Sequence, residues 1–378
     1  MNTWSAQHNP KTDCRHFRGH VPCKPHKKQG YLCGDCPVYD SVNSRILIIK
    51  LGAAGDVIRT TPLLHRLRKD FPQAEITWLT YFPDLVPKVV DRVISFTDLA
   101  KLLWLRAQAF DWIINLDKDD EAITLTEQIS AGRKSGFGMD KRGKCHPLGS
   151  DAEKAKWMTG LWDDLNKANR RSYMEEMFTI CGYTYAGETY IVEHAERREW
   201  EGLDRSKPII GLNTGCGARW TSRLWAPEAW EALASKLAAD GYQPLLLGGK
   251  AEHERNTLIS EKTGARYFGH FELPVFVDLM SQCDVVVSQV TMAMHIAIGL
   301  GRPLVLMNTI FNRYEFDLFG KGMIVEPDLP CLGCFKPAYD ERCPTPPCMQ
   351  RLEPDQIAAC VAQVLESQKE VSVPTLLD

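Results

Sequence analysis

The 378-residue sequence predicts an α/β protein made of two similar halves, each with a parallel sheet covered by helices. Two observations predict this class. Short apolar runs alternate with stretches of helical spacing from Arg45 to about Thr184, and the alternation starts again at Pro208. A polar stretch from Glu193 to Lys207 separates the two series and is typical of a linker. Ligands of such sheets bind beyond the carboxyl ends of the strands, so we expect the functional residues there.

The first strand and the loop after it form the most informative local pattern. A buried strand is expected over Ile46–Ile49, followed by a tight loop at Gly52 and Gly55 and by a helix that starts near Pro62. A strand, a glycine loop and a helix N-terminus make a natural place to hold an anion or an acceptor group. Asp56 lies at the mouth of this loop, where it is either a helix cap or a catalytic base.

The other expected elements complete two sheets. Further strands of the first half are expected over Ile76–Leu79, Val93–Phe96 and Trp112–Leu116. Strands of the second half are expected over Ile209–Asn213, Pro244–Leu247, Val285–Ser288 and Leu304–Met307, with helices over Pro227–Ala239, Glu252–Lys262, Val275–Gln282 and Met292–Leu300.

The composition is that of an ordinary soluble protein of two domains, with 44% hydrophobic and 25% charged residues. The net charge of -3 gives no electrostatic footprint for nucleic acid, and no apolar run approaches the roughly 20 residues that span a bilayer. The N-terminus lacks the basic and apolar regions of a secretory signal. We therefore expect a cytoplasmic protein whose thiols stay reduced.

Eight of the 13 cysteines fall into two groups of four, and in a reducing compartment such groups indicate metal ligands. The first group lies in residues 1–44, a segment with little periodicity that is too short to bury a core alone. Its members are Cys14, Cys23, Cys33 and Cys36, with His16, His20 and His26 as possible substitutes. Four thiols fit a tetrahedral zinc or iron site; the alternative is a disordered tail with free thiols.

The second group lies near the C-terminus, in residues 331–348. It consists of Cys331 and Cys334 followed by Cys343 and Cys348, in a stretch whose prolines exclude a helix. Four thiolates accept zinc and iron equally and leave no open position, so a structural metal is expected rather than a catalytic one. The alternatives are a flexible loop with free thiols and a disulfide formed on oxidation. If both groups bind metal, the protein carries about two ions per chain.

Five stretches of sequence carry a family resemblance. They are Ile46–Leu64 (Ile-Leu-Ile-Ile-Lys-Leu-Gly-Ala-Ala-Gly-Asp-Val-Ile-Arg-Thr-Thr-Pro-Leu-Leu), Arg133–Phe137, Asn213–Trp230, Leu246–Lys250 and Ser288–Leu306. In this order, over roughly residues 45 to 360, they resemble glycosyltransferase family 9, the ADP-heptose:lipopolysaccharide heptosyltransferases and their relatives. The four cysteines at 331–348 resemble the iron-binding finger of the autotransporter heptosyltransferase branch.

The resemblance implies a GT-B fold, with two Rossmann-like domains facing a cleft. The expected parts are a metal-binding extension (1–44), an acceptor domain (45–205) and a donor domain (206–378). It also implies an inverting transfer, without a catalytic divalent metal, from a nucleotide diphosphate sugar to a lipopolysaccharide, glycan or protein acceptor. ADP-heptose is the first donor to test. A peripheral position at the inner membrane and an oligomeric state are left open.

Family roles can be carried over to the residues that match. The donor contacts implied are Gly55, Asn213, Thr214, Glu252, Thr291, Met292, Ala293 and His295. Arg223 replaces a cation that usually meets the diphosphate, and the N–H groups of Met292 and Ala293 open the helix that would receive the phosphates. Glu252 is either a ribose contact or a solvated helix-start residue, and His295 either a donor contact or a packed side chain.

Two departures and one competing pattern remain. The Asp that this family usually has before its Ser/Thr-Gly pair is Val290 here, and the Gly is Met292, so the resemblance does not identify the sugar. Asp117 and Asp119 form an Asp-x-Asp after a strand, which in GT-A enzymes holds a divalent metal. Asp117 is also a second candidate for the base, whereas surface exposure is the simpler expectation for Asp119 and Asp120. The alternatives are therefore a metal-dependent transferase and a metal-cluster protein that only binds.

Overall fold

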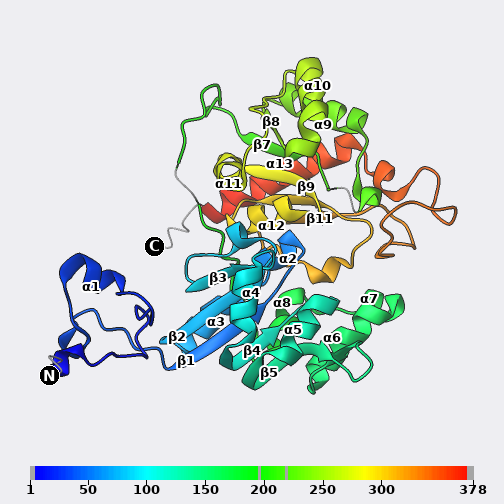
Figure 1. Cartoon of the computed structure of the whole chain (residues 1–378). Helices are drawn as coiled ribbons and strands as arrows, with labels where there is room; N and C mark the ends of the chain where they lie inside the picture. The colour runs from blue at the N-terminus through cyan, green and yellow to red at the C-terminus, as the bar shows by residue number, and fades with distance from the viewer. Residues whose placement is uncertain (1–4, 195–196, 218–219, 373–378) are drawn as a thin grey trace, which may run out of the picture. The chain divides into compact units, whose positions relative to one another are not determined.

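The computed structural model describes residues 5–194, 197–217 and 220–372 (Figure 1). Two positions of the expected linker (195–196) and two of the basic loop (218–219) lie outside these ranges. The chain divides into two compact units. The first consists of Met1–Gly52 and Leu63–Glu153, and the second of Ala53–Pro62 and Lys154–Asp378. Each unit is built around its own sheet, which confirms the predicted α/β class.

The sheet of the first unit has the strand order β3-β2-β1-β4-β5-β6. Its parallel strands are β1 (Ser44–Ile49), β2 (Ala74–Thr80), β3 (Arg92–Ser95), β4 (Ala109–Asn115) and β5 (Ser130–Met139), with β6 (Cys145–Pro147) antiparallel at the edge. The four strands expected from apolar runs are confirmed, whereas β5 and β6 were not expected. Strand β5 contains Gly136, whose φ is +102°. A Cβ at this position would lie 1.8 Å from the backbone carbonyl oxygen of Asn115. This close approach explains the glycine of the Arg133–Phe137 stretch.

The helices of the first unit are α1 (Lys24–Gln29), α3 (Leu63–Asp70), α4 (Leu99–Arg106) and α5 (Asp120–Gln128). Leu63, Leu64 and Leu67 are the buried residues of α3, as their helical spacing predicted. One core cluster includes Leu47 and Ile49 of β1 together with residues of β4 and α5.

The sheet of the second unit is parallel throughout, with the order β11-β10-β9-β7-β8. Its strands are β7 (Ile209–Asn213), β8 (Gln243–Leu247), β9 (Val285–Gln289), β10 (Leu304–Met307) and β11 (Gly322–Val325). Four of them were expected, and β11 was not.

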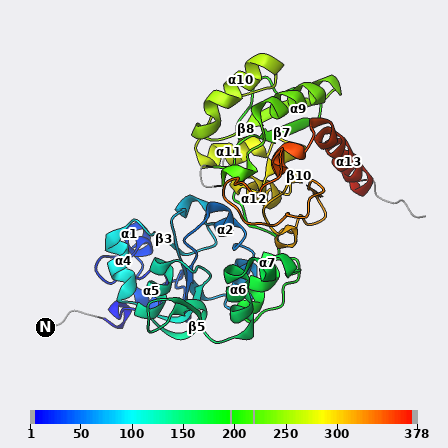
Figure 2. The same cartoon turned by 90° about the vertical axis from the view of Figure 1, so that its right-hand side faces the viewer.

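Helices cover this second sheet, with α9 and α13 on one side and α12 on the other (Figures 1 and 2). The helices of the second unit are α2 (Ala54–Ile58), α6 (Asp151–Leu161, which starts at the end of the first unit), α7 (Asp163–Ala168), α8 (Tyr173–Ile180), α9 (Pro227–Ala239), α10 (His253–Thr263), α11 (Leu273–Met280), α12 (Met292–Gly299) and α13 (Pro354–Ser372). Among the described helices, none is both long and apolar enough to cross a membrane.

The units do not coincide with the expected boundaries at 44/45 and 205/206. Helix α2 groups with the second unit because it packs on α12: a Cβ at Gly55 would lie 2.4 Å from Cδ2 of His295. Residues 154–205 group there as well, and Thr60 lies 3.3 Å from the Tyr173 hydroxyl of α8. Residues 1–44 group with the first sheet, to which Arg15 is joined through Asp91.

Candidate active site

Asp56 lies in the first turn of α2 with one oxygen used for capping and its side chain still 30% exposed. Its Oδ2 accepts the Ala53 N–H at 3.2 Å, which is the capping role that the sequence allowed. Its Oδ1 lies 2.8 Å from Nε of Arg59. The structure thus gives Asp56 a fixed orientation and partial access to solvent, both of which a general base needs.

Arg59 joins Asp56 to a second carboxylate. Its Nη1 lies 3.3 Å from Oε2 of Glu315, and its guanidinium lies 3.8 Å from the centre of the Tyr173 ring. Burial lowers the pKa of Arg59, but the charges of Asp56 and Glu315 outweigh burial and raise it above its usual value. Neither Arg59 nor Glu315 was expected at the site from the sequence. The three-residue spacing of Asp56 and Arg59 could have indicated an ion pair, whereas nothing local indicates Glu315.

His295 lies behind this cluster, packed against α2. Its ring centre is 5.8 Å from that of Tyr190 and 6.4 Å from that of Phe316. Burial and the neighbouring Arg59 lower its pKa to about 3, although Asp56 acts in the opposite direction. Its buried Nδ1 has no hydrogen-bond partner in the described chain. This environment matches the packing alternative for His295, as a neutral ring.

Buried polar side chains gather at the carboxyl edge of the second sheet, where the fold predicts ligand binding. The Asn213 amide donates to the Gly215 carbonyl at 3.0 Å and to the Ser288 hydroxyl at 3.2 Å. The Thr214 hydroxyl donates to the Asn256 side chain at 2.5 Å. These bonds fix the loops after β7 and β9 relative to each other.

The start of α12 is capped by its own N-cap residue. The Thr291 hydroxyl accepts the Ala293 N–H at 3.2 Å. We expected this N–H to face a phosphate, but in the structure it is already used by Thr291. Val290, at the position of the usual acidic residue, is buried and presents its carbonyl to Arg223.

Arg223 ends a short 3₁₀ turn (Thr221–Arg223) and is surrounded by carbonyl groups. It donates to the carbonyls of Val290 and Cys216, the latter at 2.7 Å, and lies 5.4 Å from the centre of the Phe311 ring. Burial lowers the pKa of Arg223, and Cys216 partly opposes this effect. A cation held by neutral carbonyls at a sheet edge is well suited to receive an anion.

Glu252 caps the turn after β8. Its Oε2 accepts the Gly249 N–H at 2.9 Å, and a Cβ at Gly215 would lie 2.3 Å from its Oε1. Arg255, nearby on α10, donates to the Thr214 carbonyl at 2.7 Å. Glu252 therefore lies beside the loop after β7, which is compatible with a donor contact as well as with capping.

Asp117 is held inside the first unit and is only 4% exposed. It accepts hydrogen bonds from the Lys50 ammonium and the Leu51 N–H, and the Gly52 N–H lies 3.4 Å from its Oδ2. It neutralises a buried lysine and fixes the loop after β1. This arrangement favours a structural role over that of a base or metal ligand. Asp119 is the N-cap residue of α5.

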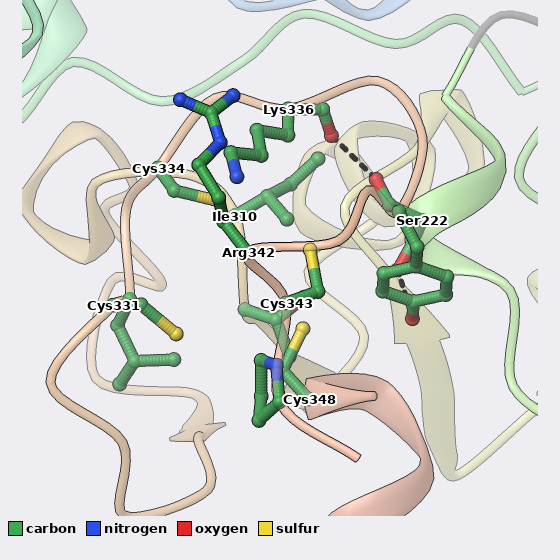
Figure 3. A pocket seen from close by; sticks show the side chains of 12 residues that line it. Ser222, Ile310, Cys331, Cys334, Lys336, Arg342, Cys343 and Cys348 are labelled. Atoms are coloured by element: carbon green, nitrogen blue, oxygen red, sulfur yellow. Dashed lines mark hydrogen bonds between the residues drawn. The ribbon is translucent and has the colours of Figure 1, made fainter. Parts of the chain in front are cut away.

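Each four-cysteine group lines one pocket. Cys331, Cys334, Cys343 and Cys348 surround the first, with Ser222 and Tyr339 nearby, and Figure 3 shows them around a common space. Cys14, Cys23, Cys33 and Cys36 line the second, together with His16. All eight are free thiols. Within the described residues, no three Cys, His, Asp or Glu side chains already form a metal-binding group.

Two units, each built on its own mainly parallel sheet, have the architecture of the GT-B class of folds. The profile of glycosyltransferase family 9 (heptosyltransferase) matches residues 100–315, more than half of the chain. The chain belongs to this family, and it is a glycosyltransferase.

Two lipopolysaccharide heptosyltransferases are similar to this chain, each with a low sequence identity to it. The core heptosyltransferase OpsX of Haemophilus influenzae is 22% identical over 73% of this chain and 82% of its own length. Lipopolysaccharide heptosyltransferase 1 of Pseudomonas aeruginosa is 20% identical over 85% of this chain and 98% of its own length.

Solved structures share the fold. The family 9 glycosyltransferase of Veillonella parvula has a TM-score of 0.66 at 19% identity, covering 86% of this chain and 98% of its own. ADP-heptose lipopolysaccharide heptosyltransferase II of Escherichia coli has a TM-score of 0.61 at 19% identity. The match covers 86% of this chain and 99% of that chain. The iron-containing dodecameric glycosyltransferase TibC of enterotoxigenic E. coli has a TM-score of 0.56 at 11% identity. The match covers 86% of this chain and 77% of that chain.

Proposed function

We propose that this enzyme transfers a heptosyl group from ADP-heptose to a lipopolysaccharide-type acceptor. The observation that carries the proposal is the partly exposed Asp56 carboxylate, in the same unit as the cation Arg223, in a member of family 9. The relatives support the chemistry, since both are named as lipopolysaccharide heptosyltransferases. ADP-heptose is favoured because a family member of the same fold is named for it.

The reaction we propose is a single displacement with inversion. The acceptor hydroxyl attacks the anomeric carbon of the sugar while its proton passes to Asp56. The bond from that carbon to the phosphate oxygen breaks, and the electron pair leaves with the nucleoside diphosphate. Arg223 balances the negative charge of the leaving group. Arg59 and Glu315 act as positioning residues that hold the Asp56 carboxylate.

Val290 bears on which sugar is transferred and not on the class of reaction. The side chain expected to contact sugar hydroxyls is apolar here, so other groups would have to bind them. Glycan and protein acceptors are the alternatives to lipopolysaccharide. Because nucleotide sugars and reduced thiols both belong to the cell interior, we propose that the enzyme works in the cytoplasm.

We also propose that the C-terminal cysteines, residues 331–348, bind a structural zinc or iron ion. The support is the common pocket of the four thiols, and the name of TibC as an iron-containing enzyme of the same fold. When bound, the ion would cross-link a loop rich in prolines; it would supply no catalytic chemistry, because four protein ligands leave no open position.

The test of the transferase proposal is donor binding followed by turnover. Isothermal titration with ADP, GDP and UDP should give tight binding for ADP only, and ADP-heptose should then be turned over with release of ADP. Negligible, equal binding of all three nucleotides would refute the proposal. Turnover that survives EDTA would also separate this mechanism from a metal-dependent Asp-x-Asp transferase.

A further inference from the structure

We propose that the N-terminal segment, residues 5–43, is a metal-dependent module in which Cys14, Cys23, Cys33 and Cys36 bind one structural zinc or iron ion. The site is separate from the C-terminal cysteines, which lie in the other unit. The proposal does not depend on the transferase activity proposed above, because it concerns metal content and order in this segment.

Residues 5–43 have no hydrophobic core. None of residues 5–43 is buried, whereas burial begins at Ile46 in β1. The larger apolar side chains of the segment point outward: Phe17 is 36% exposed, Val21 51% and Val38 43%. Its only α-helix, α1, has six residues, too few to be stable in isolation. Burial of apolar surface therefore cannot account for its fold.

The four thiols of this segment share one pocket, where a larger domain would have buried apolar side chains. All four cysteines are partly buried and line one pocket, while Tyr31 and Tyr39 line its wall and remain 37% exposed. A small segment in which four cysteines share one pocket with partly exposed aromatic residues has the pattern of a metal-centred module.

Local backbone structure places each of the four cysteines. Cys33 and Cys36 bracket a 3₁₀ turn, and Cys23 is the N-cap residue of α1. The turn at Cys33 packs closely on the chain before it, since a Cβ at Gly34 would lie 2.6 Å from the Gln7 Cα. Cys14 pairs with Ser41 in an isolated β-bridge. Three short structures thus bring the four thiols to the pocket: the β-bridge carries Cys14, the start of α1 carries Cys23, and the 3₁₀ turn carries Cys33 and Cys36.

The histidines and charges also fit a thiolate site. Nδ1 of His20 lies 2.8 Å from the Arg18 carbonyl and Nδ1 of His26 lies 3.0 Å from the Tyr31 carbonyl, whereas His16 lines the pocket. Residues 5–43 contain six Lys or Arg and three Asp. This positive excess offsets the two negative charges that remain when four thiolates bind a divalent ion.

A metal here would have a structural consequence for the first unit. Arg15, next to Cys14, donates to Asp40 at 2.8 Å and to Asp91 of the sheet unit at 2.5 Å. Its Nη1 also lies 3.3 Å from the Ala74 carbonyl at the start of β2. The ion would therefore order the segment that clamps the amino ends of β2 and β3.

The experiment is elemental analysis of the full chain, purified under reducing conditions without a metal-binding tag. A Cys331→Ser/Cys334→Ser background removes the contribution of the C-terminal group. One zinc or iron ion per chain should remain in this background, and further Cys33→Ser/Cys36→Ser substitution should remove it. Cys145→Ser/Cys360→Ser, outside both groups, serves as the matched control and should keep the ion. Absence of zinc and iron from the background protein, or retention after all four substitutions, would overturn the proposal.

Limited trypsin digestion of the wild-type chain covers the case in which a variant fails to fold. The segment carries exposed trypsin sites at Arg18, Lys27 and Lys28. Removal of metal by a chelator should speed cleavage there at least ten-fold, and added Zn²⁺ or Fe²⁺ should restore resistance. Equal cleavage with and without the chelator, in protein shown to have lost its metal, would overturn the structural role.

Discussion

Nε of Arg59 lies 2.8 Å from Oδ1 of Asp56, in a ten-residue segment that groups with the second sheet unit although the chain reaches it directly after the first strand. Oε2 of Glu315, in the 3₁₀ turn after β10 of the second unit, lies 3.3 Å from Nη1 of the same arginine. Asp56, the proposed base, is thus fixed by the unit that also carries Arg223.

Asp56→Asn should lower kcat by roughly 10²-fold or more, because the amide cannot accept the acceptor proton. ADP binding should change little. Glu315→Gln is the matched control, since it removes the other carboxylate partner of Arg59. As the loss of a positioning residue, it should lower kcat only a few-fold, because Asp56 keeps its hydrogen bond from the Ala53 N–H and its ion pair with Arg59. Equal losses in both variants would mean that Asp56 only positions Arg59, and unchanged turnover in Asp56→Asn would exclude it as the base.

Arg223→Ala should weaken the binding of ADP and of the sugar donor together, because the proposed contact is to phosphate. Loss of one charge-assisted hydrogen bond is worth about 2 kcal/mol, or roughly 30-fold in Kd. Titration calorimetry measures both ligands. Lys236→Ala is the control, since it removes an exposed cation of the same unit that pairs with Asp240 at 2.7 Å. An unchanged Kd for ADP in Arg223→Ala would rule out the phosphate role.

Asp117→Asn should act on stability rather than on chemistry. It leaves the buried Lys50 without its charged partner, which costs about 3–5 kcal/mol of the free energy of unfolding. Urea denaturation measures this loss. The Lys50→Met/Asp117→Asn double variant, which removes both charges, should recover part of it. If Asp117→Asn instead folds with wild-type stability and has lost kcat, Asp117 is the base.

The neutral state of His295 predicts acid sensitivity. Its pKa is about 3 in the folded protein and 6.5 in the unfolded chain, so below pH 6.5 only the unfolded chain takes up the proton. Stability should therefore fall, by about 1.4 kcal/mol per pH unit from this group, as the pH drops from 6.5 toward 3. His295→Gln should show a shallower fall than wild type in urea denaturation at pH 6.5 and 4.5. The exposed His270→Gln should match wild type; equal slopes in all three proteins would contradict the prediction.

Cys331→Ser/Cys334→Ser should lower the metal content of the full chain by about one ion. Elemental analysis without a metal-binding tag measures this. The loss should accompany greater protease sensitivity of residues 331–348, because the loop would lose its cross-link. Cys181, the buried C-cap residue of α8, belongs to neither cysteine group and serves as the control. Cys181→Ala should leave the metal content intact. Unchanged content in the double variant would rule out the C-terminal site.

The sequence was sufficient for the parts of the fold that local pattern encodes. Ile46–Ile49 and Leu304–Met307 are apolar runs, and both are strands with these residues. Strand β5 was missed because three glycines and two cations interrupt its pattern. Strand β11 was missed because it is a short edge strand that contains a glycine.

At the candidate site too, local sequence pattern indicates single residues but not the contacts between distant segments. Asp56 and its capping role could be recognised from a loop pattern, and Arg223 from a basic loop. Contacts between distant segments could not, since periodicity does not say which sheet a short helix will join. The Arg59–Glu315 pair and the use of the Ala293 N–H by Thr291 belong to this second kind.

The return of residues 53–62 to the second unit also sets an order of folding. Arg59 and Glu315 are 256 residues apart in the sequence. At ribosomal rates of about 5–20 residues per second, α2 waits roughly 13 to 50 seconds for its partners to be synthesised. Until then Val57 and Ile58, buried in the finished protein, have no second sheet unit to pack against. No fragment that ends before Glu315 can form this cluster, so the second unit completes its fold only after the chain is nearly whole.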